Sequence, residues 1–287
     1  SRGLGDVYKR QIKRHMRRYI YFVFLLCCAV NLLLTSCVRQ KYVVMDMVHH
    51  NPGEAMTESK FLDPSFLKKN EYGAKVFFLF EAAQFGIDWK SFDPSLFPDT
   101  TEAGRWVAEK AEIIHKKYDA AKKEDLQVYC MLDMLVLPSL LVEKHRTELT
   151  NEQGKLDISK PYTQLCIREL MKEMFETFPQ LDGLVIRTGE TYLHDAPYYV
   201  GNHPVQNGMY DHITLINLLR EEVCERRNKK LFYRTWDMGQ LHSIPKYYLS
   251  VTDSIEPHPN LYFSIKHTMT DFWRSTITDP DMNYNIC

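Results

Sequence analysis

Short apolar runs that alternate with helix-sized amphipathic segments are the feature that most constrains this chain. The apolar runs cover residues 41–48, 75–82, 126–135, 182–190, 230–237 and 261–268. Segments 100–123, 159–178 and 211–227 repeat their apolar residues at the helical period. Continuous apolar strands that alternate with amphipathic helices are typical of parallel βαβ units. The pattern therefore predicts an α/β fold with a parallel sheet.

Such a sheet either closes into a barrel or stays open and doubly wound. An open sheet usually binds a nucleotide through a glycine-rich first turn, and the sequence contains no such motif. Polar residues instead follow the strands, which is where a barrel gathers its active site. We therefore predict a TIM (β/α)8 barrel that is truncated after about six strands and lacks roughly two βα units. A complete protein with an unusual sheet is the alternative.

The first 37 residues are expected to lie outside the folded domain. Residues 1–15 precede a plausible start at Met16 and resemble a cloning or assembly scar. Residues 16–37 have a basic start, an apolar stretch and the sequence Leu-Thr-Ser-Cys, which resembles a bacterial lipobox. We expect export, lipidation of Cys37 and anchoring in a membrane, which we interpret as the outer membrane. An uncleaved transmembrane anchor is the alternative, and residues 38–287 are predicted to form the partial barrel.

Composition and charge narrow the classes of partner. The net charge is −1, so no overall field attracts nucleic acid. Aromatic residues make up 13% of the chain, a share that suits both a core and a sugar site. The cysteines that follow the signal segment are widely spaced, which indicates small buried hydrophobes rather than disulfides or a metal cluster. These are Cys130, Cys166, Cys224 and Cys287.

Carboxylates near the strand ends are the candidate catalytic groups. Two carboxylates that flank a glycosidic bond can hydrolyse it, one protonating the leaving oxygen and the other activating water or attacking carbon. Glu190 is the preferred acid, because Tyr192 and Tyr198 are expected to desolvate it and raise its pKa. Arg187 pairs with Glu190, binds a substrate carboxylate, or forms a surface salt bridge. The candidate carboxylates are Glu190, Asp133, Asp237 and Asp271.

Further residues near the strand ends are candidates for substrate binding. Asp133 either binds substrate or holds a neighbouring loop, and Trp236 either stacks on a sugar or belongs to the core or the barrel rim. Glu81 is expected to face the barrel interior as a buried structural partner. The scattered histidines argue against a metal-dependent hydrolase, so no metal or other cofactor is predicted. The predicted binding residues are Arg187, Lys266, Asp133, Arg234, Asp237, His267, His50 and Trp236.

Three segments between residues 181 and 275 resemble, in order, a stretch of the microbial α-glucuronidases. They read LDGLVIRTGETYLHDAPYYVGNHPVQNGMYDHITLINLLRE, KLFYRTWD and IEPHPNLYFSIKHTMTDFWR. Members of that family are (β/α)8-barrel glycoside hydrolases that remove glucuronic acid branches from xylan. The resemblance implies Glu190 as general acid and Asp271 as a carboxylate that helps to activate water. It also implies Arg187 and Lys266 as basic residues near the sugar acid, with Arg234 as the basic residue of the intervening strand.

This sequence departs from the family in its motif. In the family, the catalytic acid is the glutamate of a Ser-Glu pair that precedes a Gly-Pro turn. This chain instead has Gly189-Glu190-Thr191-Tyr192. The family's second catalytic carboxylate and its accessory domain find no match here. We expect a glycoside hydrolase acting on a polysaccharide, with a uronic acid as one candidate sugar. A non-catalytic glycan-binding lipoprotein is the alternative. If the enzyme inverts, as the family does, Glu190 and Asp271 should stand roughly 6.5–9.5 Å apart.

Overall fold

One parallel sheet forms the centre of the part of the chain that the structure describes. The computed structural model describes residues 43–46, 59–78, 81–189, 191, 193, 195–235 and 240–265. All of them except Val43 belong to one compact unit, Val44–Cys287. The strands of the sheet are β1 Met45–Asp46, β2 Ala74–Phe77, β3 Gln127–Asp133, β5 Leu181–Arg187, β7 Lys230–Arg234 and β8 Leu261–Ser264.

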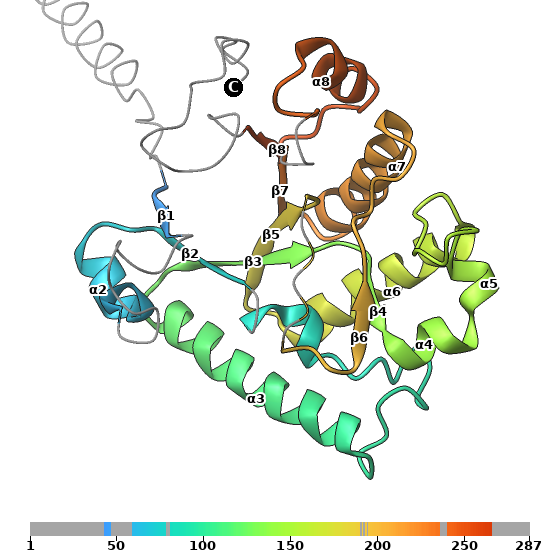
Figure 1. Ribbon diagram of the computed structural model, residues 1–287. Helices are drawn as coiled ribbons and strands as arrows, with labels where there is room; N and C mark the ends of the chain where they lie inside the picture. The colour runs from blue at the N-terminus through green and yellow to red at the C-terminus, as the bar shows by residue number, and fades with distance from the viewer. Residues whose placement is uncertain are drawn as a thin grey trace, which may run out of the picture. The chain divides into compact units, whose positions relative to one another are not determined.

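The strand order distinguishes the two ways in which such a sheet can be built. The strands lie side by side in chain order, β1-β2-β3-β5-β7-β8, and every neighbouring pair is parallel (Figure 1). A doubly wound sheet reverses its strand order at a switch point, and no reversal occurs among the described strands. Successive parallel strands in chain order are the arrangement of a (β/α)8 barrel. The predicted fold class is confirmed, since the described residues contain six parallel strands in this barrel order.

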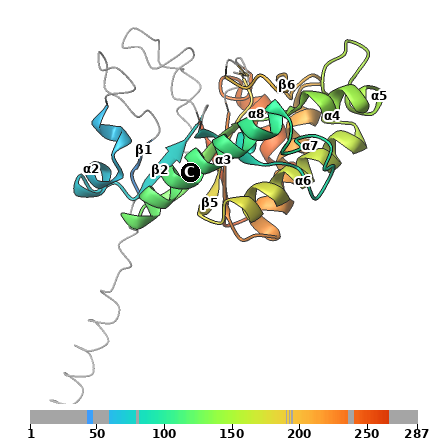
Figure 2. The same cartoon turned by 90° about the horizontal axis from the view of Figure 1, so that it is seen from below.

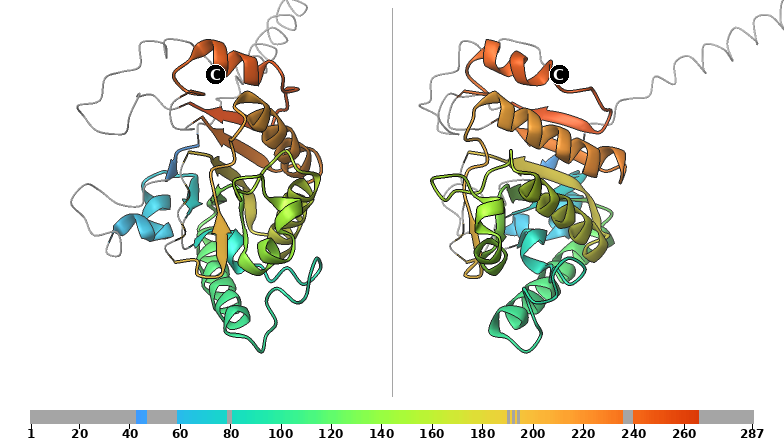
Figure 3. Two further views of the ribbon diagram at one scale, coloured as in Figure 1. Left: turned by 45° about the vertical axis from the view of Figure 1, so that its right-hand side comes forward. Right: turned by 90° about the vertical axis from the view of Figure 1, so that its right-hand side faces the viewer.

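Helices α3 (Glu102–Lys123), α6 (Pro161–Thr177) and α7 (Met209–Leu219) each connect two neighbouring strands and cover one face of the sheet. Figures 2 and 3 show α3, α6 and α7 along this face, and their buried residues share one large core with the strands. The predicted helix 211–227 is α-helical only in its first part, because a π-helical segment, Arg220–Glu225, follows α7. The α-helices are α2 Pro64–Lys69, α3 Glu102–Lys123, α4 Ser139–Lys144, α5 Arg146–Leu149, α6 Pro161–Thr177, α7 Met209–Leu219 and α8 Pro245–Thr252.

Helix α3 begins and ends where its sequence predicts. The hydroxyl of Thr101 accepts a hydrogen bond from the backbone N–H of Gly104 at 3.0 Å, which satisfies one of the unpaired donors of the first turn. Basic residues occupy the last turn, where they oppose the negative end of the helix dipole. The residues Val107, Ile114 and Tyr118 of its apolar stripe are fully or almost fully buried against the sheet.

The side chains of the strands alternate between two separate apolar clusters. In β3, Val128, Cys130 and Leu132 belong to the large core beneath the helices. Tyr129 and Met131 point the other way, into a smaller cluster with residues of β2 and β5. This second face corresponds to the interior of a barrel, and we call it the inner face. Asp133 follows Met131 by two positions and therefore lies on the inner face.

Two loops that follow the strands are joined by a short antiparallel pair of strands. β4 (Val136–Pro138) follows β3, β6 (Tyr199–Gly201) follows β5, and the two pair in register. We call this pair the β4–β6 ribbon. The ribbon links segments more than sixty positions apart at the edge of the sheet where the strands end (Figure 1).

One prediction about the inner face is wrong. Glu81 does not face the barrel interior, because its carboxylate forms an ion pair with Lys117 of α3. In β2, Val76 belongs to the inner cluster and Phe77 to the large core, so continued alternation would also place Glu81, four positions after Phe77, on the helix side. The backbone carbonyl of Glu81 also accepts a hydrogen bond from the hydroxyl of Tyr118 at 2.9 Å, which fixes this segment on the helix side.

The cysteines of the described region behave as small apolar residues. Cys130, Cys166 and Cys224 are buried free thiols, as predicted, and burial raises their pKa to about 12, 12 and 11. Cys287 lies outside the described residues. None of the helices in the described ranges is long and apolar enough to cross a membrane. The predicted signal segment, 16–37, lies outside these ranges.

Candidate active site

Charged side chains terminate the inner face on three neighbouring strands. Asp133 is the last residue of β3, Arg187 of β5 and Arg234 of β7. Asp133 and Arg187 are direct partners in the register, and the partners Ile186 and Tyr233 place Arg234 next to Arg187. We call these three residues the strand-end layer. The rest of the inner face is apolar, so the charged residues of the layer border a hydrophobic surface.

The guanidinium of Arg187 and the carboxylate of Asp133 form a two-point ion pair. Nη2 of Arg187 donates to Oδ2 of Asp133 at 2.7 Å, and Nε donates to Oδ1. The side chains are only 12% and 7% exposed, so the pair is buried. The salt bridge considered from the sequence, between Arg187 and Glu190, involves a residue outside the described ranges. A buried two-point pair of this kind fixes both side chains in orientation. Asp133 thus has a structural partner on the neighbouring strand.

Arg234 extends the layer towards β8. Its Nη1 lies 3.3 Å from the sulfur of Met131, a residue of the inner-face cluster. The backbone of Arg234 pairs with Ser264, the last residue of β8. The described charged groups of the strand-end layer are therefore two guanidinium groups and one carboxylate.

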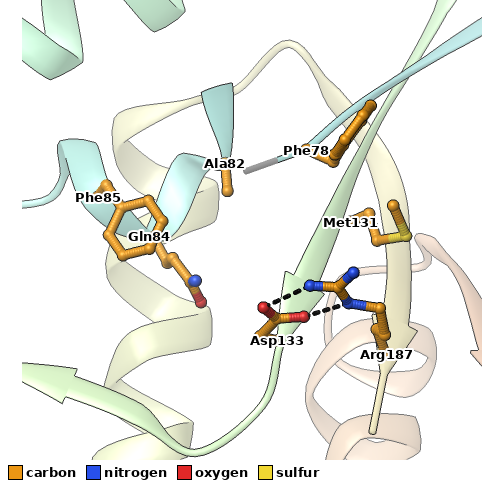
Figure 4. A pocket seen from close by; sticks show the side chains of 7 residues that line it. All are labelled: Phe78, Ala82, Gln84, Phe85, Met131, Asp133 and Arg187. Atoms are coloured by element: carbon orange, nitrogen blue, oxygen red, sulfur yellow. Dashed lines mark hydrogen bonds and ion pairs between the residues drawn. The ribbon is translucent and has the colours of Figure 1, made fainter. Parts of the chain in front are cut away.

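A small pocket opens beside the ion pair (Figure 4). It has room for about 10 Å³, one water-sized sphere. Gln84 extends into it from a short 3-10 helix, Ala83–Gly86, with its amide directed towards Asp133 (Figure 4). Gln84 is 3% exposed, and no described residue hydrogen-bonds to its Oε1. We call this the Gln84 pocket; its lining residues are Phe78, Ala82, Gln84, Phe85, Met131, Asp133 and Arg187.

Gln84 was not predicted as a site residue. The sequence signal is faint, since Gln84 is one polar residue within the otherwise apolar stretch Ala82–Gly86. Its burial against the strand-end layer depends on the short helix folding back over β3. The backbone N–H of Ala83 donates to the sulfur of Cys130 at 3.1 Å, and this contact holds the helix there.

Three of the predicted site residues lie among the described residues and come together in the strand-end layer: Asp133, Arg187 and Arg234. Their roles towards a substrate stay predictions. Tyr198, which was expected to desolvate Glu190, packs edge-on against Trp106 of α3, with 5.8 Å between the two ring centroids. No group of three or more His, Cys, Asp or Glu side chains suited to a metal occurs among the described residues. The predicted site residues outside the described ranges are Glu190, Asp271, Lys266, Asp237, His267, His50, Trp236 and the lipidation residue Cys37.

Comparison with known proteins finds similarity of chain path at low sequence identity. No protein-family model matches the chain, and no curated protein matches it. A GH138 enzyme targeting pectin rhamnogalacturonan II is 14% identical with a TM-score of 0.42, over 79% of this chain and 25% of that one. Dispersin B is 13% identical with a TM-score of 0.40, over 77% and 63% of the two chains.

A third solved structure gives the same result. The glycoside hydrolase family 5 enzyme PbGH5A from Prevotella bryantii B14 is 10% identical with a TM-score of 0.40, over 78% of this chain and 63% of that one. The chain therefore spans between 25% and 63% of the length of these three structures.

Proposed function

We propose that this protein is a glycoside hydrolase whose active site lies at the strand-end layer. The observation that carries the proposal is the layer itself. An apolar inner face ends in charged groups on three neighbouring strands, at the edge where barrels hold their catalytic residues. Glu190 follows Arg187 by three positions, so even a fully extended chain would leave the Cα atoms of these two residues no more than about 11 Å apart.

The mechanism divides the work between two carboxyl groups. Glu190 donates its proton to the glycosidic oxygen as the bond to the anomeric carbon breaks. Asp271 accepts a proton from the water that attacks that carbon from the opposite face. This assignment follows the resemblance of the sequence to the α-glucuronidases and predicts inversion of configuration. No cofactor takes part in this scheme.

We assign a uronic acid as the preferred sugar. The support is the resemblance of the sequence to the α-glucuronidases, together with the guanidinium groups of the strand-end layer, which are able to bind a carboxylate. Because Asp133 occupies the edge of Arg187 formed by Nε and Nη2, we give the contact with the sugar acid to Arg234 and Lys266. Arg187 then acts by holding Asp133 in place.

The test is hydrolysis by the product of the whole gene. A panel of 4-nitrophenyl glycosides of glucuronic acid, galacturonic acid, glucose, galactose and xylose, together with uronic-acid-branched xylo-oligosaccharides, is assayed with the unmodified protein and the Glu190→Gln variant. Removal of a general acid is expected to lower kcat about 10²- to 10⁴-fold. Glu152→Gln, an exposed glutamate in a turn, is the matched control and should leave the rate unchanged.

The leaving group makes the assignment of the acid specific. 4-Nitrophenol departs as an anion with little help, whereas a sugar hydroxyl needs a proton. The loss in Glu190→Gln should therefore be larger for the xylo-oligosaccharides than for the aryl glycosides. Equal losses would show that Glu190 is not the acid. Binding of sugars without turnover of any panel member would instead favour the non-catalytic glycan-binding lipoprotein.

We also propose that Cys37 carries a lipid that anchors the protein in the outer membrane. The support is the resemblance of residues 34–37 to a lipobox after a basic and apolar segment. In a bacterial host fed with an alkyne-bearing fatty acid, the protein should become labelled, and Cys37→Ala should abolish the label. Cys28→Ala, within the apolar segment, is the control and should keep it. Label that persists in Cys37→Ala would refute the anchor.

A further inference from the structure

The Gln84 pocket contains a polar group that the mechanism proposed above does not use. The amide oxygen Oε1 of Gln84 is buried, and no described residue donates a hydrogen bond to it. Buried amide oxygens in native proteins nearly always have a partner, since an unpaired one destabilises the fold. Its position beside the Asp133–Arg187 pair (Figure 4) points to a partner that arrives from outside the fold.

The backbone around Gln84 is held from two sides. On one side, the N–H of Ala83 donates to the sulfur of Cys130 on β3 at 3.1 Å. On the other, the ring of Phe85 packs edge-on against Tyr199 at 5.0 Å. The hydroxyl of Tyr199 also donates to the backbone carbonyl of Gln84 at 3.4 Å. The amide is therefore presented to the pocket by a fixed backbone, as a binding residue requires.

We propose that Gln84 is a specificity-determining residue whose Oε1 accepts a hydrogen bond from one hydroxyl group of the bound sugar. This inference rests on the proposed glycoside hydrolase function. The size of the pocket supports it, because about 10 Å³ admits a single hydroxyl-sized group and no sugar ring. A hydroxyl group can supply the proton that an amide oxygen needs, whereas a sugar carboxylate cannot.

The remaining lining of the pocket explains why one hydroxyl group would be selected. Phe78, Ala82, Phe85 and Met131 offer apolar surface. Both oxygens of Asp133 already accept hydrogen bonds from Arg187. A deoxy sugar would leave Gln84 unpaired in this surrounding, and the loss of one hydrogen bond to a buried group lowers kcat/KM by about 10- to 100-fold.

The experiment compares Gln84→Met with the unmodified protein. Both hydrolyse the best 4-nitrophenyl glycoside of the panel and the monodeoxy analogues of that sugar. We expect Gln84→Met to lower kcat/KM about 10- to 100-fold on the parent glycoside. One deoxy analogue should be equally poor for both proteins, which identifies the hydroxyl group. Gln153→Met, an exposed glutamine in a turn, is the control. A uniform loss on all analogues, or no loss on any, would overturn the inference.

Thermal unfolding is a second measurement, and it distinguishes a role of Gln84 in binding from a role in holding the fold together. Replacing an unpaired buried amide by an apolar side chain of similar volume should leave Tm unchanged or raise it. A clear fall in Tm for Gln84→Met would show that the fold itself satisfies the amide, and would overturn the inference.

The same measurement separates failure of the inference from failure of the proposed function. If no glycoside is hydrolysed, the hydrolase proposal fails. D-glucuronic acid, D-galacturonic acid, D-glucose and D-xylose are then added at millimolar concentration, and Tm is followed. A sugar that raises the Tm of the unmodified protein but not of Gln84→Met would still support the inference. A set of sugars that raises neither would overturn it.

Discussion

Breaking the buried ion pair of the strand-end layer should be costly. Arg187→Met leaves the carboxylate of Asp133, whose side chain is 7% exposed, without the two hydrogen bonds that it accepts from the guanidinium. Removing one partner of a buried pair typically costs about 3–5 kcal/mol. In a domain of this size each kcal/mol lowers Tm by about 2–4 °C, so we expect a fall of roughly 6–20 °C.

The assay is urea unfolding of the whole gene product, followed by circular dichroism. Arg187→Met, Asp133→Leu and the double variant form a cycle that isolates the interaction between the two side chains. We expect a coupling free energy of about 2–3 kcal/mol, with the double variant more stable than the sum of the single changes predicts. The same order of stability should appear in thermal unfolding.

An exposed ion pair provides the reference for this cycle. Lys90 and Asp99 lie 3.1 Å apart with side chains 51% and 81% exposed, so Lys90→Met should cost less than about 1 kcal/mol. If Arg187→Met costs no more than this control and shows no coupling with Asp133, then water reaches the pair freely. That result would refute the conclusion that the ion pair of the strand-end layer is buried.

Two further predictions concern stability. Asp93 accepts a hydrogen bond from Lys144 at 2.8 Å, and this contact is the main reason why its pKa is lowered to about 2. Asp93 therefore stabilises the fold above its unfolded pKa of 3.8, by about 1 kcal/mol after solvent screening. Urea titrations from pH 7 to pH 2 should show Asp93→Asn less stable at pH 7, with the difference vanishing as the pH falls from about 4 to about 2; a difference independent of pH would contradict this. Gly183→Ala should destabilise the sheet by more than about 2 kcal/mol, since a Cβ there would lie 2.1 Å from the backbone oxygen of Lys230 and 3.0 Å from the ring of Tyr129. An unchanged urea midpoint for this variant would mean that β5 and β7 are not packed as described.

The sequence predicted the sheet well because its main signal is local. Each of the six strands lies within or beside an apolar run, and the three connecting helices follow the helical period. The cap of α3 is likewise a local feature, since Thr101 and its hydrogen-bond partner lie three positions apart. Such features need only neighbouring residues and general stereochemistry.

The features that were missed depend on contacts between distant parts of the chain. β4 and β6 have three residues each and become strands only by pairing across two loops. Asp133 and Arg187 were both recognised as candidates, but their pairing follows from the register of β3 on β5, which no local pattern reveals. Glu81 was misplaced because the sequence does not show which residues of β2 face the helices: Phe77 does, and Glu81, four positions later, pairs with Lys117 of α3 on the same side.

The β4–β6 ribbon has a consequence for the thermodynamics of binding at this edge of the sheet. Loops that border a site usually lose backbone freedom when a ligand arrives, and that loss opposes binding. Here strand-type hydrogen bonds already join the loops after β3 and β5, and Tyr199 of the ribbon reaches the carbonyl of Gln84. Much of the ordering therefore occurs when the chain folds. A ligand would then bind against loops whose sequence can vary, as loop sequences do, but whose backbone is held as rigidly as that of a sheet.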